Sequence, residues 1–164
     1  DAGRWEAAEK HIQQALVALP GETDVSEELV PRLEKAGRQP QADELFAKVF
    51  GVYADGVQAY PDCALLHNNL AWTYAELGRD LDRALALATA AVKMEPDNPV
   101  YLDTYAEVYS RRGQADRAVA IARQALQAEP EGGAHREHLE RQLERFTAKL
   151  RADAHPNAPT PRLR

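Results

Sequence analysis

The chain has 164 residues, of which 45% are apolar and 28% are charged, and its formal net charge is −6. A chain of this length can bury a core without covalent cross-links. The single cysteine, Cys63, excludes an internal disulfide framework and a multi-cysteine zinc site. The acidic balance argues against nucleic acid as the main partner, and no apolar run approaches the ~18 residues of a membrane span.

Residues 4–18 carry an apolar stripe with helical spacing, which includes Trp5, Ile12 and Leu16, and Pro20 closes the segment. Its pattern corresponds to the second helix of a repeat whose first helix is missing. Half of a repeat cannot bury its apolar face alone. We therefore expect that the sequence is a piece of a longer array, or that a partner covers this end. Self-association through this half-repeat is one such arrangement.

Residues 23–60 form a longer copy of the repeat that follows them. Leu33 and Gly37 precede Tyr74 and Gly78 by 41 residues, seven more than a 34-residue period. Seven residues are close to two helical turns, so a lengthened second helix keeps the same face inward. The pattern predicts one long helix over 40–60, and Pro31 predicts a kinked or weakened first helix.

The two clearest copies occupy residues 63–95 and 98–129. Tyr74 and Gly78 recur 35 residues later as Tyr109 and Gly113. Small residues in the second helix of each copy predict that two antiparallel helices approach closely, and a proline follows each second helix. The pairs that recur at 34 residues are Ala84 and Ala118, Ala88 and Ala122, Ala91 and Ala125, and Pro96 and Pro130.

These copies resemble the tetratricopeptide repeat (TPR) family, whose pattern is W-x₂-L-G-x₂-Y…A-x₃-F…P. The leading Trp site holds His67 and Leu102, and the Phe site holds Ala88 and Ala122, which are departures from the family pattern. The matching positions are Leu70-Ala71, Tyr105-Ala106, Tyr74, Tyr109, Ala84, Ala118, Pro96 and Pro130. The resemblance implies an all-α fold, an α-α superhelix built as a right-handed TPR solenoid. We expect a single array over 1–151, with about three helical-hairpin repeats and an N-terminal half-repeat.

The array is expected to end in a capping helix over 134–151. Leu139, Leu143, Phe146 and Leu150 lie on one side of this segment, and charged residues cover the rest. A solvated cap is the simplest interpretation, and an amphipathic helix that docks elsewhere is the alternative. Residues 152–164 are Pro-rich and lack periodicity, which predicts a disordered or extended tail.

The sequence offers no convincing catalytic or metal site, and we expect no enzyme activity and no cofactor. Cys63 and His67 are spaced as neighbours on one helical face, but an ordinary small residue in a turn accounts for Cys63. His135 and His138 are also close in register. They lack the H-E-x-x-H pattern and a third ligand, so we expect a solvated pair.

In TPR proteins the first helix of each repeat lines a concave groove, so the resemblance implies a partner-binding face. Asn69 is the position at which the family often places an Asn that holds a peptide backbone, although it could instead bond to a neighbouring helix. Bases of the carboxylate-clamp type are absent, because those positions hold Glu27, Val100 and Thr104. The residues expected to contact a partner are Leu65, Asn68, Asn69, Trp72, Glu76, Asp103, Thr104, Glu107 and Arg111.

The favoured function is a non-catalytic interaction module or scaffold that binds an extended or helical segment of a protein or peptide. Acids outnumber bases on the expected groove, where Glu28 and Glu34 also face inward, so a neutral or basic segment is favoured. The alternatives are a self-associating structural element and a regulatory arm of a larger enzyme. The amino-acid sequence of the repeats resembles that of bacterial TPR proteins, including envelope-associated ones. The compartment stays open, with the cytoplasm as the default.

Overall fold

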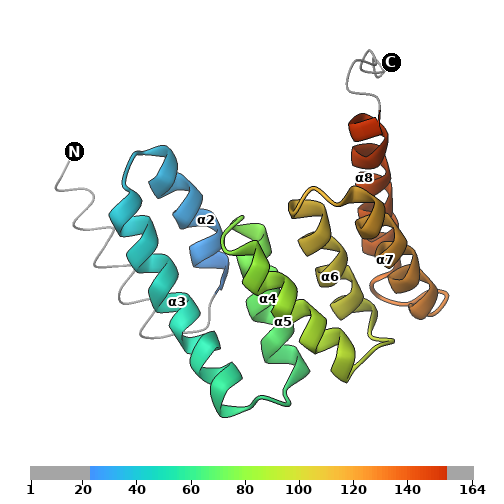
Figure 1. Ribbon diagram of the computed structural model, residues 1–164, viewed down its shortest axis with the longest axis horizontal. Coiled ribbons are helices and arrows are strands. Elements are labelled where there is room, and N and C mark those ends of the chain that lie inside the picture. The colour runs from blue at the N-terminus through green and yellow to red at the C-terminus, as the bar shows by residue number, and fades with distance from the viewer. Residues whose placement is uncertain (1–22, 155–164) are drawn as a thin grey trace.

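The computed structural model describes residues 23–154, and this part of the chain contains helices and no strand. Figure 1 shows the helices following one another along the array. Their bounds are α2 (Thr23–Lys35), α3 (Gln39–Ala59), α4 (Ala64–Glu76), α5 (Leu81–Met94), α6 (Pro99–Arg111), α7 (Ala115–Ala128) and α8 (Arg136–Ala154). The expected half-repeat helix over 4–18 lies outside the described residues.

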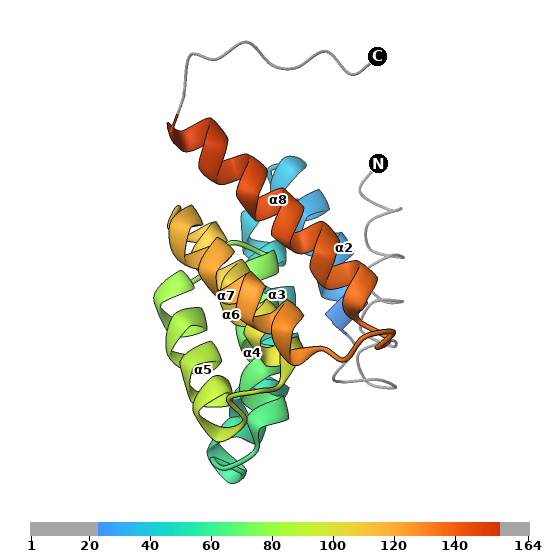
Figure 2. The same cartoon turned by 90° about the vertical axis from the view of Figure 1, so that its right-hand side faces the viewer.

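The helices pair as antiparallel hairpins, α2 with α3, α4 with α5 and α6 with α7, and α8 packs on the last hairpin (Figures 1 and 2). Each second helix contacts the first helix of the next hairpin. The first helices α4 and α6 also contact each other extensively, whereas successive second helices do not. The stack therefore curves with its first helices on the inner side. This is the α-α superhelix that the repeat pattern predicted.

The same chain reversal ends the first helix of every hairpin. Gly37, Gly78 and Gly113 have φ values of 71°, 62° and 75°, which only glycine adopts without strain. In each case the next backbone N–H reaches back to a carbonyl in the last helical turn, with distances of 2.8, 3.0 and 2.9 Å. This is the Schellman pattern of helix ends. The glycines therefore fix where each second helix begins.

Alanines let the two helices of each hairpin approach closely. Ala71, Ala84, Ala88 and Ala91 are completely buried in the α4–α5 hairpin. The equivalent alanines of the α6–α7 hairpin are equally covered, and Phe146 from α8 completes that core. A side chain larger than methyl would overfill these positions. The predicted role of the small residues is confirmed.

The long helix α3 is continuous across both of its glycines and spans 21 residues. At Gly56 an added Cβ would lie 3.4 Å from the Leu66 side chain, which is an ordinary van der Waals contact, so the close approach of α4 does not require this glycine. Pro31 lies inside α2, and that helix continues beyond it to Lys35.

The end of α8 corrects one boundary. Residues 152–154 were assigned to the Pro-rich tail, but α8 extends to Ala154. The segment Arg151–Ala154 is free of proline and includes good helix formers, so nothing local stops the helix there. Residues 155–164 lie outside the described part. None of the described helices combines the length and apolar character needed to cross a membrane.

Candidate partner-binding face

The inner side of α4 keeps an open surface. Leu65 is 54% exposed, and Asn69, Trp72 and Glu76 are half-buried. Asn68 is buried, and its Nδ2 donates to Asn69 Oδ1 at 3.4 Å. The Asn68 Oδ1 atom accepts no hydrogen bond from any described residue. This stretch thus offers an exposed apolar side chain and a half-buried indole, whereas the Asn68 amide oxygen is itself buried.

The middle of the inner side of α6 is covered, and this corrects the expected accessibility of three residues. Asp103, Thr104 and Glu107 are buried, with 6%, 3% and 0% of their surfaces exposed. They were expected to face a ligand together with Arg111. Side chains from α8 instead reach Asp103 and Glu107. These two carboxylates serve internal contacts, and Arg111 alone remains exposed among the four.

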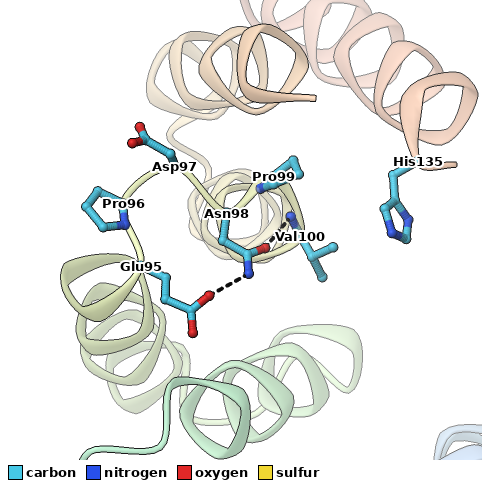
Figure 3. Close-up of a pocket in the computed structure, with 7 residues that line it drawn as sticks. All are labelled: Glu95, Pro96, Asp97, Asn98, Pro99, Val100 and His135. Carbon is cyan, nitrogen blue, oxygen red and sulfur yellow. Dashed lines mark hydrogen bonds between the residues drawn. The ribbon is translucent and has the colours of Figure 1, made fainter. Parts of the chain in front are cut away.

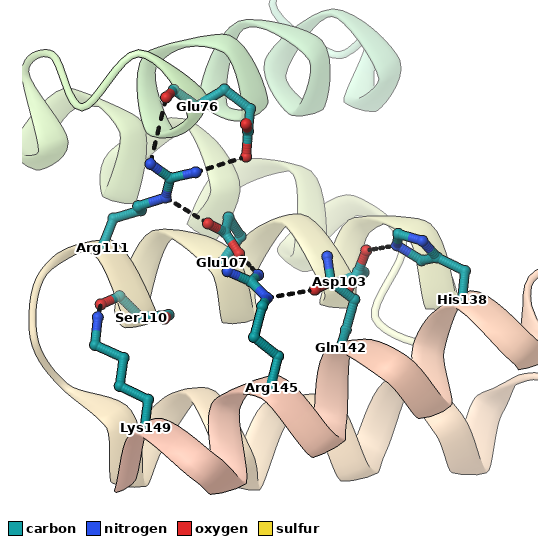
Figure 4. Close-up of polar contacts among 9 residues, drawn as sticks. All are labelled: Glu76, Asp103, Glu107, Ser110, Arg111, His138, Gln142, Arg145 and Lys149. Carbon is teal, nitrogen blue, oxygen red and sulfur yellow. Dashed lines mark hydrogen bonds and ion pairs between the residues drawn. The ribbon is translucent and has the colours of Figure 1, made fainter. Parts of the chain in front are cut away.

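A chain of ion pairs joins α4, α6 and α8 across this surface (Figure 4). Arg111 on α6 contacts Glu76 of α4 at 3.0 Å and Glu107 of its own helix at 2.5 Å. Arg145 of α8 pairs with the second oxygen of Glu107. Glu107 is therefore a buried carboxylate held between two guanidinium groups. Its charge is compensated within the chain, as buried charges generally are.

The acids beside Arg111 change the pKa of its guanidinium group. Burial acts to lower the pKa of this guanidinium, but the hydrogen bond to Glu107 and the charges of Glu107 and Glu76 outweigh it and raise the pKa. Arg111 stays protonated and bound between these acids. The expected surplus of acid on the groove is thus largely neutralised at α6. A preference for basic segments remains a prediction.

A second contact between α6 and α8 joins Asp103 to His138. Their Oδ2 and Nε2 atoms are 2.8 Å apart. Burial raises the pKa of the Asp103 carboxyl group, an effect that the hydrogen bond from His138 partly opposes and that nearby Glu107 strengthens. The other oxygen, Oδ1, accepts no hydrogen bond from the described residues. Nearer the end of α8, Lys149 donates to the Ser110 carbonyl.

Glu34 was also expected on the groove, and an arginine of the next hairpin binds it. Arg79 pairs with Glu34 at 2.6 Å and with Asp43 at 2.8 Å, and its guanidinium lies 4.5 Å from the Phe46 ring centre. The hydrogen bonds from Gln39 and Arg79 lower the pKa of Asp43. This cluster joins the first two hairpins. Like the α8 contacts, it depends on residues that are distant in the sequence.

Neither weaker chemical candidate forms a site in the described residues. His67 is buried, and its Nδ1 lies 3.0 Å from the Cys63 carbonyl oxygen, so the imidazole bonds to main chain. His138 binds Asp103, and His135 lies near it across a small cavity. No group of three potential metal ligands comes together within residues 23–154.

Sequence comparison and fold comparison agree on the architecture. A family model described as tetratricopeptide repeat matches residues 1–137. The chain belongs to this family. A comparison with curated protein sequences finds no significant match. Among solved structures, the chain is similar to the crystal structure of the Sgt2 TPR domain from Aspergillus fumigatus, with a TM-score of 0.60 and 17% sequence identity. The match covers 84% of this chain and 89% of that one.

TPR folds in general mediate protein–protein interaction. At 17% identity the Sgt2 domain establishes the fold alone. The sequence pattern predicted that the first helices lie on the inner side of the stack. It missed Arg145, His138 and Lys149, whose cationic or imidazole side chains share one side of α8. Their spacing of 7 and 4 residues was the available signal.

Proposed function

We propose that this TPR array is a non-catalytic interaction module that holds a segment of a partner protein against the inner face of α4. One observation carries the proposal. Leu65 is 54% exposed and Trp72 is half-exposed on the same helix, which also carries the half-buried amide of Asn69. The equivalent surface of α6 is occupied by the chain's own ion pairs. Binding is therefore assigned mainly to α4.

The chemistry of these residues favours an extended segment with an apolar side chain and a free backbone N–H. Leu65 and Trp72 supply contact area that loses water on binding. The half-buried amide of Asn69 can accept a hydrogen bond from a backbone N–H of the segment. Charge also affects which segments this surface prefers. Glu76, at its edge, is already paired with Arg111. A neutral segment satisfies these groups, and a basic one adds attraction to the net acidic chain.

The proposal is tested by selecting segments from a displayed peptide library on the intact chain and measuring their affinity by calorimetry. Leu65→Ala and Trp72→Ala should each weaken binding by about tenfold or more, because central apolar and aromatic anchors dominate interfaces. Val52→Ala is the matched control, since Val52 is a 44% exposed aliphatic residue on the second helix α3. Equal losses in the Leu65 and Val52 variants, or none in either, would contradict the assignment.

A further inference from the structure

Exposed apolar side chains gather at the end of the array where α4 and α6 begin. Among the described side chains, five large apolar ones are exposed, and four of these lie in or beside the two turns that lead into α4 and α6: Tyr60, Leu65, Met94 and Val100. The fifth is Val52 on α3. Both turns lie on the lower side of the stack in Figure 1, opposite the glycine turns. A gathered set of exposed apolar groups is typical of an interaction surface.

A small buried cluster lies beneath these side chains and holds their helices together. It consists of Ala64 from α4, Ala91 from α5 and Tyr101 from α6. Leu65 adjoins this cluster from α4 and Val100 adjoins it from α6, at equivalent positions of two helices that are in contact. Met94 is on the last turn of α5, one turn beyond the alanine that this helix contributes. The exposed side chains therefore surround one region of the array.

A hollow of about 590 Å³ adjoins Val100 in this region (Figure 3). The turn over residues 95–99 forms one side of it, and His135 lies across from Val100. Proline and valine side chains line the hollow together with the carboxylates of Glu95 and Asp97. It can therefore receive an apolar side chain and bring a neighbouring charged group close to acids.

The carboxylates at this edge have no cationic partner, unlike the arginine-bound carboxylates of the inner face. Asp62, Glu95 and Asp97 are exposed, and none of them forms an ion pair with a described residue. Glu95 accepts a hydrogen bond only from the neutral amide of Asn98, at 2.9 Å. Lys93 is the nearest base in the sequence, and it pairs with none of the three. The uncompensated negative charge closest to the proposed binding site is therefore at this edge.

We propose that the partner segment held by α4 continues past Leu65 over this edge, where it carries a basic residue next to an apolar one. The inference rests on the proposed function, because it extends the same site. The apolar side chain would lie against Val100 in the hollow, and the lysine or arginine beside Glu95 and Asp97. Charge complementarity of this kind gives an interface its specificity. An acidic segment would be repelled here.

One short segment is long enough to make all of these contacts. Trp72 and Leu65 are seven positions apart on α4, which is about 10 Å along the helix axis. Neighbouring helices pack with their axes about 8–10 Å apart. Since an extended chain covers ~3.3 Å per residue, about seven residues span from Trp72 to Val100.

The test compares selections from a displayed library of segments of about ten residues, made on the parent chain and on the double variant Glu95→Gln/Asp97→Asn. Both replacements keep the shape of an exposed side chain. Segments selected on the parent should be enriched in a lysine or arginine beside an apolar residue, and segments selected on the variant should keep only the apolar residue. Asp55→Asn/Asp116→Asn is the matched control, because it removes the same charge from exposed positions on α3 and α7. It should select the basic residue as the parent does.

Calorimetry with one selected segment then measures each contribution. Replacing the basic residue of the segment with glutamine should weaken binding to the parent by about fivefold at low salt, and should have little effect on binding to the Glu95→Gln/Asp97→Asn chain. Val100→Ala should also weaken binding by about fivefold, because less apolar surface loses water. Val52→Ala, the exposed valine on α3, should leave the affinity unchanged.

The outcomes separate this inference from the proposed function. Selection without enriched bases, equal enrichment on the Glu95→Gln/Asp97→Asn chain, or unchanged affinity in Val100→Ala would overturn the inference. If such segments still depended on Trp72, the proposed function would stand. Segments that bind independently of Trp72, or a selection that yields no segment, would overturn both, because no segment would then reach the edge from α4.

Discussion

The inner faces of α4 and α6 are built from equivalent positions and yet differ in accessibility. Thirty-five residues separate each matched pair: Leu65 and Val100, Asn68 and Asp103, Trp72 and Glu107, Glu76 and Arg111. On the inner face of α4 an indole and a leucine are open to solvent, whereas on α6 the carboxylate that matches the indole is buried beneath α8. The repeat fixes where these side chains lie. The neighbouring helix decides whether they remain available to a partner.

The largest expected effect comes from loosening α8. Phe146 is fully buried in the core that α8 shares with α6 and α7. Phe146→Ala should lower the free energy of unfolding by ~3–5 kcal/mol, because it removes a buried ring and leaves a cavity. Chemical denaturation measures the loss. Hydrogen exchange should then accelerate in α6 and α8 more than in α4, and uniform acceleration would indicate that α8 does not close α6 selectively.

Breaking the ion pairs that link α4, α6 and α8 should have the next largest effect on the free energy of unfolding. Variants at Glu107 and Glu76 compare the faces of α6 and α4 directly. Glu107→Ala leaves Arg111 and Arg145 without their shared carboxylate, and we expect a loss of about 2–3 kcal/mol, reduced by the partial exposure of both arginines. Glu76→Ala removes only the partly exposed end of the chain, with an expected loss under ~1 kcal/mol. Urea denaturation of both variants checks the order. A loss of stability in Glu76→Ala as large as in Glu107→Ala would contradict the deeper burial of the Glu107 carboxylate.

The sequence predicted those features that depend on local pattern. The helix ends at Gly78 and Gly113 recur after 35 residues and the alanine contacts of α5 and α7 after 34, so each copy supports the other. The closure of α6 depends on pairs 35 to 39 residues apart, such as Asp103 with His138 and Ser110 with Lys149. The charges of α8 are typical of a solvated helix, and only its packing angle turns them toward α6. Local periodicity cannot supply that angle.

The smallest expected effect is a difference in pH dependence between two carboxylates. Burial, the largest influence, raises the pKa of Asp103, so the folded chain binds its proton more tightly than the unfolded chain. Its contribution to stability is present below the ordinary carboxyl pKa of about 3.9 and is lost as pH rises through the folded value. Asp43 on α3 has the opposite sign, because hydrogen bonds from Gln39 and Arg79 lower its pKa. Its contribution is present above about 3.9 and is lost as pH falls through the folded value.

Denaturation of Asp103→Asn and Asp43→Asn as a function of pH measures both contributions against the parent chain. Relative to the parent, Asp103→Asn should gain stability as pH rises through the acidic range, and Asp43→Asn should lose it. The exposed carboxylate of Asp43 is screened by solvent, so its slope should be the shallower of the two. If the stability of both variants relative to the parent changed in the same direction with pH, the opposite pKa shifts of Asp103 and Asp43 would be contradicted.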